Sequence, residues 1–165
     1  MEPWIKWVET PELKGRIAIV RKPRGGHFLE HDIAALRDGG LTVLVSLLGE
    51  TEALELDLDH QGEACRAAGL GFVHVPVQDF GVPRSFDLTL AAVDEIATGV
   101  SQGGAAGFHC FASRGRSPTL AACVLIRLGL TSDDAIQRLS RARGFPIPET
   151  DGQRQWIAEF EERLR

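Results

Sequence analysis

Short apolar runs alternate with amphipathic stretches along most of the chain. The run at 41–48 is largely apolar over its whole length, which is typical of a central strand buried on both faces. The run at 16–20 is β-branched and apolar, and two further short runs follow later in the chain. The pattern therefore predicts strands at 16–20, 41–48, 71–77 and 104–108.

Helical patterns lie between and after these runs. A short helix ends at Gly39-Gly40, and the last helix is amphipathic, with Trp156, Ile157 and Phe160 on one face. Alternating strands and helices imply βαβ crossovers. We therefore expect an α/β fold with a central, mostly parallel sheet flanked by helices on both faces. The predicted helices cover 32–38, 50–68 with an interruption near Asp59, 86–100, 118–128, 131–143 and the residues after 149.

The length and composition of the chain limit what it can be. At 165 residues it is long enough for one substantial core, so residues 1–165 are expected to form a single domain. Residues 1–13 show no clear periodicity and are a candidate N-terminal extension. A net charge of −5 argues against a general affinity for nucleic acid or for an anionic membrane.

The three cysteines, Cys65, Cys110 and Cys123, form no CxxC pair, and their odd number does not suggest a disulfide framework. A reducing compartment fits this pattern. The first residues do not resemble a signal peptide, and no apolar run approaches the roughly 18 residues needed to span a bilayer. We expect a cytoplasmic protein without stable membrane insertion.

The segment from His109 to Ser117 has the strongest chemical pattern in the chain. It follows one predicted strand and opens a predicted apolar helix, where unpaired N–H groups and the helix dipole favour an anion. The same groups would favour the thiolate of Cys110, which is the nucleophilic form. Arg116, six residues later, can bind two phosphate oxygens through its planar guanidinium.

A phosphate site in an acidic protein needs a local excess of cations. Arg114 and Arg116 are expected to supply it, with Arg84 or Arg24 as further candidates. The basic, glycine-containing turn at 22–26 is itself more typical of a solvated loop than of a ligand site.

The Cys-x5-Arg spacing, with His109 before it, Gly115 ahead of the arginine and Ser117 after it, resembles the signature of the cysteine-dependent protein phosphatase superfamily. The alternative is a buried cysteine followed by a surface arginine. In one respect the sequence departs from the family, which usually has glycine at the position of Ser113. Because the backbone approaches the phosphate closely there, we expect Ser113 to narrow the pocket or to change the rate.

Asp79 is the candidate general acid, since a positioned carboxylic acid can protonate a departing alkoxide or phenoxide. Its turn-rich surroundings, residues 78–83, favour a structural role when considered alone. The resemblance favours the catalytic role, because the acid loop of the superfamily lies some thirty residues before the nucleophile and Asp79 precedes Cys110 by 31. Asp87 is the second candidate, although it is expected to serve a helix start.

Several segments together resemble the dual-specificity branch, particularly the kinase-associated phosphatase group, over roughly residues 15–160. This likeness implies a two-step reaction without metal or cofactor. Cys110 attacks phosphorus, Arg116 and the backbone N–H groups of 111–116 hold the oxygens, and Asp79 protonates the leaving oxygen. Ser117 stabilises the thiolate when it leaves in the second step, and His109 orders the loop. The implied substrate-binding residues are Phe111, Ala112, Ser113, Arg114, Gly115 and Gln153.

Gln153 has two interpretations of equal weight. Glu149-Thr150-x-x-Gln153 resembles a phosphatase segment whose final glutamine positions the water of the second step, and it also resembles an ordinary helix start.

The resemblance favours hydrolysis of phosphomonoesters. The first expected substrate is phosphotyrosine in proteins, and the second is phosphoserine or phosphothreonine. A phosphoprotein or phosphopeptide is then the expected partner, nucleic acid is not expected, and a monomer is assumed. The chain has no tyrosine, so the pocket cannot have a tyrosine wall. A phosphoinositide or inositol-phosphate phosphatase is the alternative that Arg114 supports. A non-catalytic phosphate-binding module and a rhodanese-like sulfur transferase rank lower.

Overall fold

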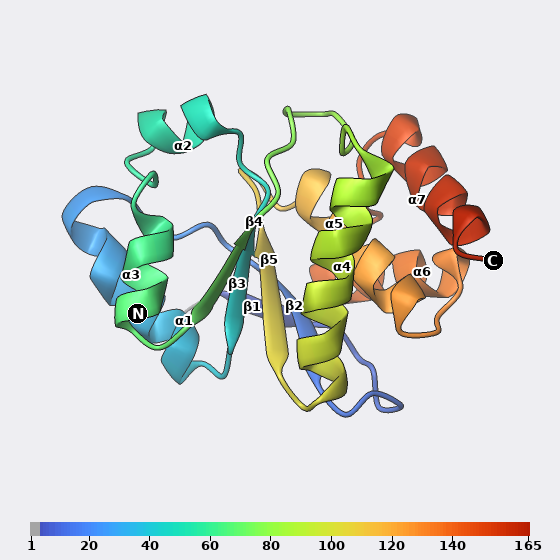
Figure 1. The fold of residues 1–165 in the computed structure, drawn as a ribbon, viewed down its shortest axis with the longest axis horizontal. Coiled ribbons are helices and arrows are strands. Elements are labelled where there is room, and N and C mark those ends of the chain that lie inside the picture. The colour runs from blue at the N-terminus through green and yellow to red at the C-terminus, as the bar shows by residue number, and fades with distance from the viewer. Residues whose placement is uncertain (1–3) are drawn as a thin grey trace.

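A five-stranded sheet lies at the centre of the computed structural model, which describes residues 4–165 (Figure 1). The spatial order of the strands is β1-β2-β5-β3-β4; β1 runs antiparallel to β2 and the other neighbours are parallel. The mostly parallel sheet predicted from the sequence is thus confirmed. The strands are β1 (Ile5–Trp7), β2 (Arg16–Val20), β3 (Val43–Ser46), β4 (Gly71–His74) and β5 (Ala105–His109).

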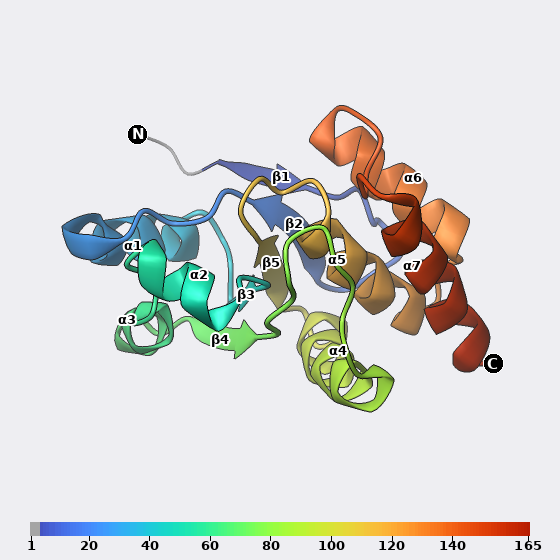
Figure 2. The same cartoon turned by 90° about the horizontal axis from the view of Figure 1, so that it is seen from above.

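Helices cover both faces of the sheet (Figure 2). The alternating side chains of β2 show why, because Ile17 and Ile19 belong to one buried cluster and Ala18 and Val20 to the other. The first group of helices, on the side of Ala18, is α1 (Leu29–Asp38), α2 (Glu50–Glu55) and α3 (Gln61–Ala67), with a short 3-10 turn at Gly26–Phe28 before α1. The second group is α4 (Phe86–Ser101), α5 (Arg116–Arg127), α6 (Ser132–Arg143) and α7 (Asp151–Arg163).

The structure corrects several boundaries of the predicted elements. The strand expected at 41–48 pairs only over Val43–Ser46, although Leu47 and Leu48 remain buried beyond its end. The first helix begins at Leu29 rather than at 32. Strand β1 was not predicted, because three residues show no repeat. Its pairing with β2, where Ile5 faces Val20, holds it in place.

Helix α5 is the most deeply buried helix of the fold. Eleven of its 12 residues are buried, and only Arg127 at its end is not. It packs against α4, α6, α7 and the sheet. Within residues 4–165, no helix is long and apolar enough to cross a membrane.

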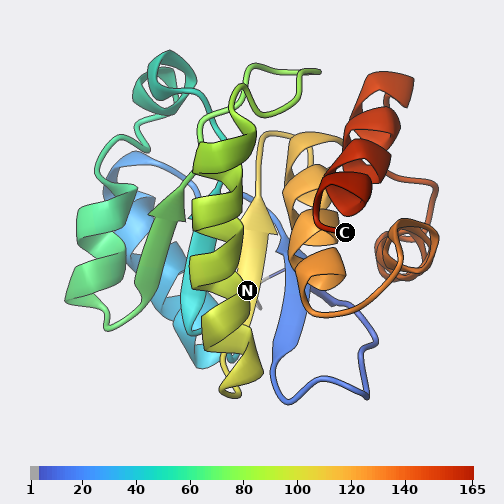
Figure 3. The same ribbon diagram turned by 45° about the vertical axis from the view of Figure 1, so that its right-hand side comes forward.

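Three connections meet at one edge of the sheet, because β3, β4 and β5 are parallel neighbours whose carboxyl ends point the same way (Figure 3). The connection after β3 leads into α2, and the one after β4 contains Asp79. The connection after β5 begins at Cys110 and ends on α5. The topology therefore brings together residues that lie far apart in the sequence.

Candidate active site

The loop from Cys110 to Gly115 joins β5 to α5, with Gly115 as the N-cap of the helix. Within the described chain, the backbone N–H groups of residues 111–115 donate no hydrogen bond to a protein acceptor. They are the type of unpaired donors that bind an anion at a helix N-terminus. Cys110 keeps 3% of its surface exposed, whereas Cys65 and Cys123 have none.

Ser117 lies directly beneath Cys110. The distance from Cys110 Sγ to Ser117 Oγ is 3.3 Å, and the serine is fully buried in the first turn of α5. A hydroxyl at this distance can donate a hydrogen bond to a thiolate. The predicted proximity of these two side chains is therefore present in the structure.

Arg116 faces inward, and its side chain is 1% exposed. Its Nη1 and Nη2 atoms donate to the two carboxylate oxygens of Glu52, over 2.7 and 3.0 Å, and Nη1 also donates to the Val77 carbonyl over 2.9 Å. A guanidinium has five N–H groups, so three are used by these partners. The N–H of Nε and the second N–H of Nη2 remain, and both lie on one edge of the planar group.

The charge of Arg116 is stabilised by the residues around it. Burial opposes the charge, but the hydrogen bonds that Arg116 donates to Glu52 and the attraction of Cys110, Glu52 and Asp79 outweigh it and raise the pKa of Arg116. The same hydrogen bonds lower the pKa of Glu52, which also accepts from the Gly49 N–H over 3.1 Å. Both groups are therefore ionised at neutral pH.

Asp79 lies at the mouth of the loop. Its Oδ1 is 3.3 Å from Arg116 Nη2, the nitrogen that also donates to Glu52, and its side chain is 51% exposed. The carboxylate also accepts from the Phe80 N–H over 3.0 Å. Asp87, the second candidate acid, lies instead in the first turn of α4, whose N-cap is Ser85.

His109 is fully buried at the end of β5. Its Nε2 is 3.0 Å from Gln61 Oε1, and its Nδ1 is 3.3 Å from the carbonyl oxygen of Cys110. Burial lowers the pKa of His109 to about 4, so the ring is neutral at physiological pH. Gln61 Oε1 and the Cys110 carbonyl oxygen can both only accept, so the single N–H of the neutral ring donates to one of them at a time.

Ser113 occupies the position at which the resemblance implies glycine, and its backbone shows why glycine suits it. Its φ is +60°, in the left-handed region that costs most residues roughly 1–2 kcal/mol. The buried side chain offsets this cost, since its hydroxyl donates to the Val20 carbonyl over 3.0 Å. The hydroxyl is thus directed at the end of β2.

Gln153 connects three segments of the site. Its N–H is capped by Thr150, its Oε1 accepts from the Thr150 N–H over 3.2 Å, and its Nε2 donates to the Gly81 carbonyl over 3.1 Å. A Cβ atom on Gly115 would lie 2.7 Å from Gln153 Nε2, so the amide packs directly on the loop. The helix-start interpretation is confirmed, and the same side chain fixes the loop that carries Asp79.

The remaining predicted residues divide between the site and the surface. Phe111, 51% exposed, and Ala112 lie at the mouth, and Arg114 lies over the ring of Phe145 at 4.9 Å. Arg24 does not join them, because its guanidinium is paired with both carboxylate oxygens of Asp32.

Sequence reasoning missed three side chains of the site: Glu52, which binds Arg116; Gln61, which binds His109; and Arg143, which binds the loop. Arg143 donates to the carbonyls of Ser113 and Ala112 over 3.2 and 3.3 Å. The position of Glu52, just after a strand at the same edge of the sheet, is a signal that would have made it a candidate.

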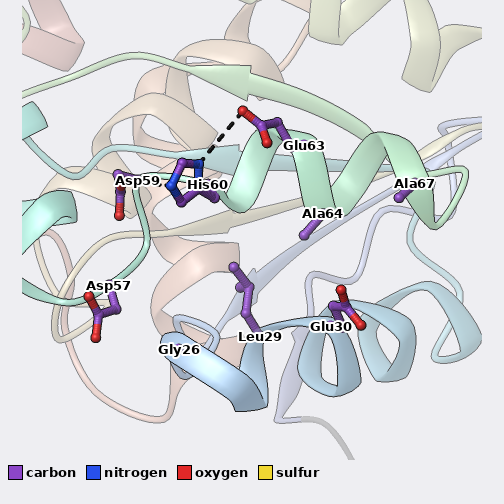
Figure 4. Close-up of a pocket in the computed structure, with 9 residues that line it drawn as sticks. All are labelled: Gly26, Leu29, Glu30, Asp57, Asp59, His60, Glu63, Ala64 and Ala67. Carbon is purple, nitrogen blue, oxygen red and sulfur yellow. Dashed lines mark ion pairs between the residues drawn. The ribbon is translucent and has the colours of Figure 1, made fainter.

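A separate pocket opens between α1 and α3, on the other face of the sheet from α4 and α5 (Figure 4). His60 within it lies 3.2 Å from Asp59. Phosphate would be repelled by the carboxylates that line it, so this pocket is not part of the phosphate site. Those carboxylates are Glu30, Asp57, Asp59 and Glu63.

Three solved structures resemble this chain over most of its length. Kinase-associated phosphatase, with serine replacing its catalytic-site cysteine, is 19% identical with a TM-score of 0.85 and covers 99% of this chain and 97% of its own. Tk-PTP in its active form is 28% identical with a TM-score of 0.72, covering 94% and 99%. PTPMT1 in complex with PI(5)P is 18% identical with a TM-score of 0.72, covering 90% and 91%.

At 19% and 18% identity, the likeness to kinase-associated phosphatase and to PTPMT1 shows a shared fold and nothing more. A family model gives the more specific result, since the one described as "Polymorphic toxin system, DSP-PTPase phosphatase" matches residues 19–130. That range includes Glu52, Asp79 and the whole loop from Cys110 to Arg116. The chain therefore belongs to this family of cysteine-dependent phosphatases.

Proposed function

We propose that this protein hydrolyses phosphomonoesters through a cysteinyl-phosphate intermediate. Its preferred substrate is phosphotyrosine in proteins. One observation supports this above all. Cys110, the free edge of Arg116 and the carboxylate of Asp79 converge on a loop whose backbone N–H groups are unpaired. A tetrahedral dianion needs such an arrangement of donors, with a nucleophile below it and an acid beside it.

In the first step, the Cys110 thiolate attacks phosphorus in line with the ester oxygen. The sulfur–phosphorus bond forms while the bond from phosphorus to the ester oxygen breaks, and that oxygen takes a proton from the Asp79 carboxylic acid. The Nε and Nη2 edge of Arg116 and the N–H groups of residues 111–116 bind the other three oxygens.

Asp79 has to leave Arg116 to act as the acid. Its carboxylate lies 3.3 Å from Arg116 Nη2, one of the two nitrogens that we assign to the phosphate, so a bound phosphate would compete with it for that nitrogen. The side chain is half exposed and lies in a turn closed by the Gly81 N–H and the Gln78 carbonyl.

In the second step, a water molecule attacks phosphorus and gives a proton to the Asp79 carboxylate. The sulfur–phosphorus bond breaks, and the Ser117 hydroxyl donates to the departing thiolate from 3.3 Å. Gln153 positions the loop that carries Asp79, through its hydrogen bond to Gly81. It also remains the candidate to orient the water, because one of its amide hydrogens has no other assigned role.

Further side chains hold the reacting groups in place. Glu52 and the Val77 carbonyl fix the orientation of Arg116, so that its free edge faces the loop. His109, neutral and bound to Gln61, orders the start of the loop and is not the base. Such preorganisation is what lets charged donors stabilise a transition state without rearranging.

The mouth of the site favours an aromatic phosphoester. Phe80 and Phe111 are 65% and 51% exposed and belong to the two loops that carry Asp79 and Cys110. Exposed rings at this position can stack on the ring of phosphotyrosine. The alternative substrate is a phosphoinositide or inositol phosphate, supported by exposed Arg114 and by the fold shared with PTPMT1, whose structure contains PI(5)P.

Steady-state kinetics on matched substrates tests this function. We expect kcat/KM to be highest for phosphotyrosyl peptides, and the Cys110→Ser variant to bind them without turnover. If only phosphoinositide or inositol phosphate is hydrolysed, the alternative substrate class is correct. If the wild-type protein binds phosphopeptides and hydrolyses none, it is a binding module.

A further inference from the structure

A row of cations extends from the reactive loop across one side of its mouth, each lying over an aromatic ring. Arg114 and Arg143 lie 4.9 and 4.4 Å from the ring of Phe145, and Arg143 also lies 4.8 Å from the ring of Trp4. Two further cations lie over the ring of Trp4, and one lies over the ring of Phe111. We name these five cations the basic stripe: Lys6 (5.5 Å from Trp4), Arg21 (5.9 Å from Trp4), Lys22 (4.9 Å from Phe111), Arg114 and Arg143.

Arg143 anchors the stripe to the loop. Its guanidinium donates to the carbonyls of Ala112 and Ser113, so it is fixed beside the phosphate site. Burial, together with repulsion from Arg114, lowers the pKa of Arg143. An anion bound beside these two arginines would relieve that repulsion.

The stripe is not neutralised by the protein. Among residues 4–165, none of its five members takes part in an ion pair, although the chain has 23 acidic and 18 basic residues. Arginines elsewhere do pair, as Arg24 does with Asp32, Arg127 with Asp94 and Arg138 with Glu12. Five unpaired cations next to one another in an acidic protein form a local site for anions.

The opposite side of the mouth is acidic. Seen from above, the loop after β5 lies between β1 on one side and the loop after β4 on the other (Figure 2). That second side carries Asp79 and Glu52, and exposed Glu50 in the same turn of α2. A uniformly charged surface or chain crossing the mouth, such as an anionic membrane or a nucleic acid, would meet these carboxylates. A short segment that is acidic on one side only would not.

We propose that the basic stripe binds acidic residues on one side of the phosphorylated residue in a peptide substrate, a specificity that rests on the proposed phosphatase function. The length of the stripe suits an extended peptide. Each cation lies 4.4–5.9 Å from the centroid of the ring it contacts, so the four contacts that link Arg114 to Lys6 through Phe145, Arg143 and Trp4 span at most about 20 Å. An extended chain advances about 3.3 Å per residue, so at most about six residues of a peptide would follow the stripe.

Three phosphotyrosyl peptides of equal length test this. One has acidic residues before the phosphotyrosine, one has them after it, and one has glutamine at all these positions. We expect kcat/KM for one of the two acidic peptides to be roughly tenfold higher than for the neutral peptide, which is the size of effect that a few partly exposed charge pairs give. For the other acidic peptide, kcat/KM should be no higher than for the neutral peptide. Added salt should reduce the preference.

Variants at the far end of the stripe localise the effect. The double variant Lys6→Gln, Arg21→Gln should lower the ratio of kcat/KM between the preferred and the neutral peptide about threefold or more. Lys14→Gln is the matched control, because Lys14 is exposed at the opposite edge of the sheet, beside Gly103, and its loss should leave the ratio unchanged. Arg143 is not used, since it also holds the loop.

Two further measurements separate the stripe from the proposed function. p-Nitrophenyl phosphate is too small to reach the stripe and reports hydrolysis alone. If neither p-nitrophenyl phosphate nor the peptides are hydrolysed, the proposed phosphatase function is wrong. The affinity of the Cys110→Ser variant for the three peptides then tests the stripe alone, and tighter binding of one acidic peptide supports it. Equal kcat/KM and equal affinity for all three peptides would overturn the proposal. So would a higher kcat/KM for phosphatidylinositol phosphate in vesicles or for 5′-phosphorylated RNA.

Discussion

The three thiols of this chain differ only in their surroundings. Cys65 and Cys123 are fully buried among apolar side chains, and burial raises the pKa of Cys65 to about 12 and that of Cys123 well above its ordinary value. Cys110 alone faces unpaired N–H groups and the charged edge of Arg116. Position in the fold, rather than residue type, thus distinguishes Cys110 as the proposed nucleophile.

Alkylation should show this selectivity. With iodoacetamide at pH 7 we expect modification of Cys110 alone in the folded protein, because the other two thiols are neutral and inaccessible. Peptide mass mapping measures the sites, and vanadate should slow the reaction. Modification of Cys65 or Cys123 at a similar rate would contradict this account of the three thiols.

We expect Glu52 to affect the proposed reaction through Arg116, to which it is hydrogen-bonded. Replacing it by glutamine removes the charge that balances a guanidinium whose side chain is 1% exposed. We expect Glu52→Gln to lower kcat/KM for an aryl phosphate roughly tenfold to a hundredfold, since a misplaced donor loses most of its transition-state stabilisation. Glu55→Gln, at the exposed end of the same helix, is the control and should have no such effect. Equal activity of the two variants would remove Glu52 from the positioning role.

At the level of secondary structure, the strand, the loop and the helix that follow one another from β5 to α5 form the centre of the site. Buried β5 and buried α5 fix both ends of the loop, so the dipole of α5 is held against the phosphate position. His109 ends β5 and links it to Gln61 of α3. The protonation state of one histidine should therefore affect the stability of the whole fold.

The pH dependence of stability follows from the lowered pKa of His109. Burial lowers it from 6.5 to about 4, so the unfolded chain binds a proton that the folded chain does not. The contribution of the neutral histidine to the free energy of unfolding is therefore fully present above pH 6.5 and is lost as the pH falls toward 4. We expect the free energy of unfolding, measured in urea, to fall by about 2 kcal/mol between pH 7 and 5 from this residue. His109→Gln should remove that fall, and His27→Gln, at an exposed site, should keep it.

The loop after β4 should govern the leaving group. Asp79→Asn cannot protonate the departing oxygen, so it should slow hydrolysis of an alkyl phosphate much more than that of an activated aryl phosphate. Comparing kcat for the two substrates in both proteins measures this difference. Equal losses on the two would exclude Asp79 as the acid.

At the level of the whole molecule, the sequence predicts the elements and motifs formed by neighbouring residues, and it misses contacts between residues that lie far apart in the chain. Strands, helices and the Cys110 loop appear as runs and spacings within about ten residues, and all but β1 were placed to within a few residues. The contact of Glu52 with Arg116 crosses 64 residues, and that of Gln61 with His109 crosses 48. Only the order of the strands brings these pairs together.

The charge distribution is also a property of the complete fold. Lys6, Arg21 and Arg143 come from β1, from the end of β2 and from α6, and only Arg21 lies next to another basic residue in the sequence, Lys22, with which it begins a basic turn. The acidic side combines α2 with the loop after β4. An overall charge of −5 therefore hides a mouth with two opposite sides.

The most direct test of the central claim is to trap the covalent intermediate. Wild-type protein and the Asp79→Asn variant would be mixed with an activated aryl phosphate, quenched in acid within milliseconds and analysed by mass spectrometry of the Cys110 peptide. The account predicts a phosphate on Cys110 that disappears as substrate is exhausted, and none in the Cys110→Ser variant. Rapid hydrolysis without any phosphate on Cys110, or with activity retained in Cys110→Ser, would contradict it.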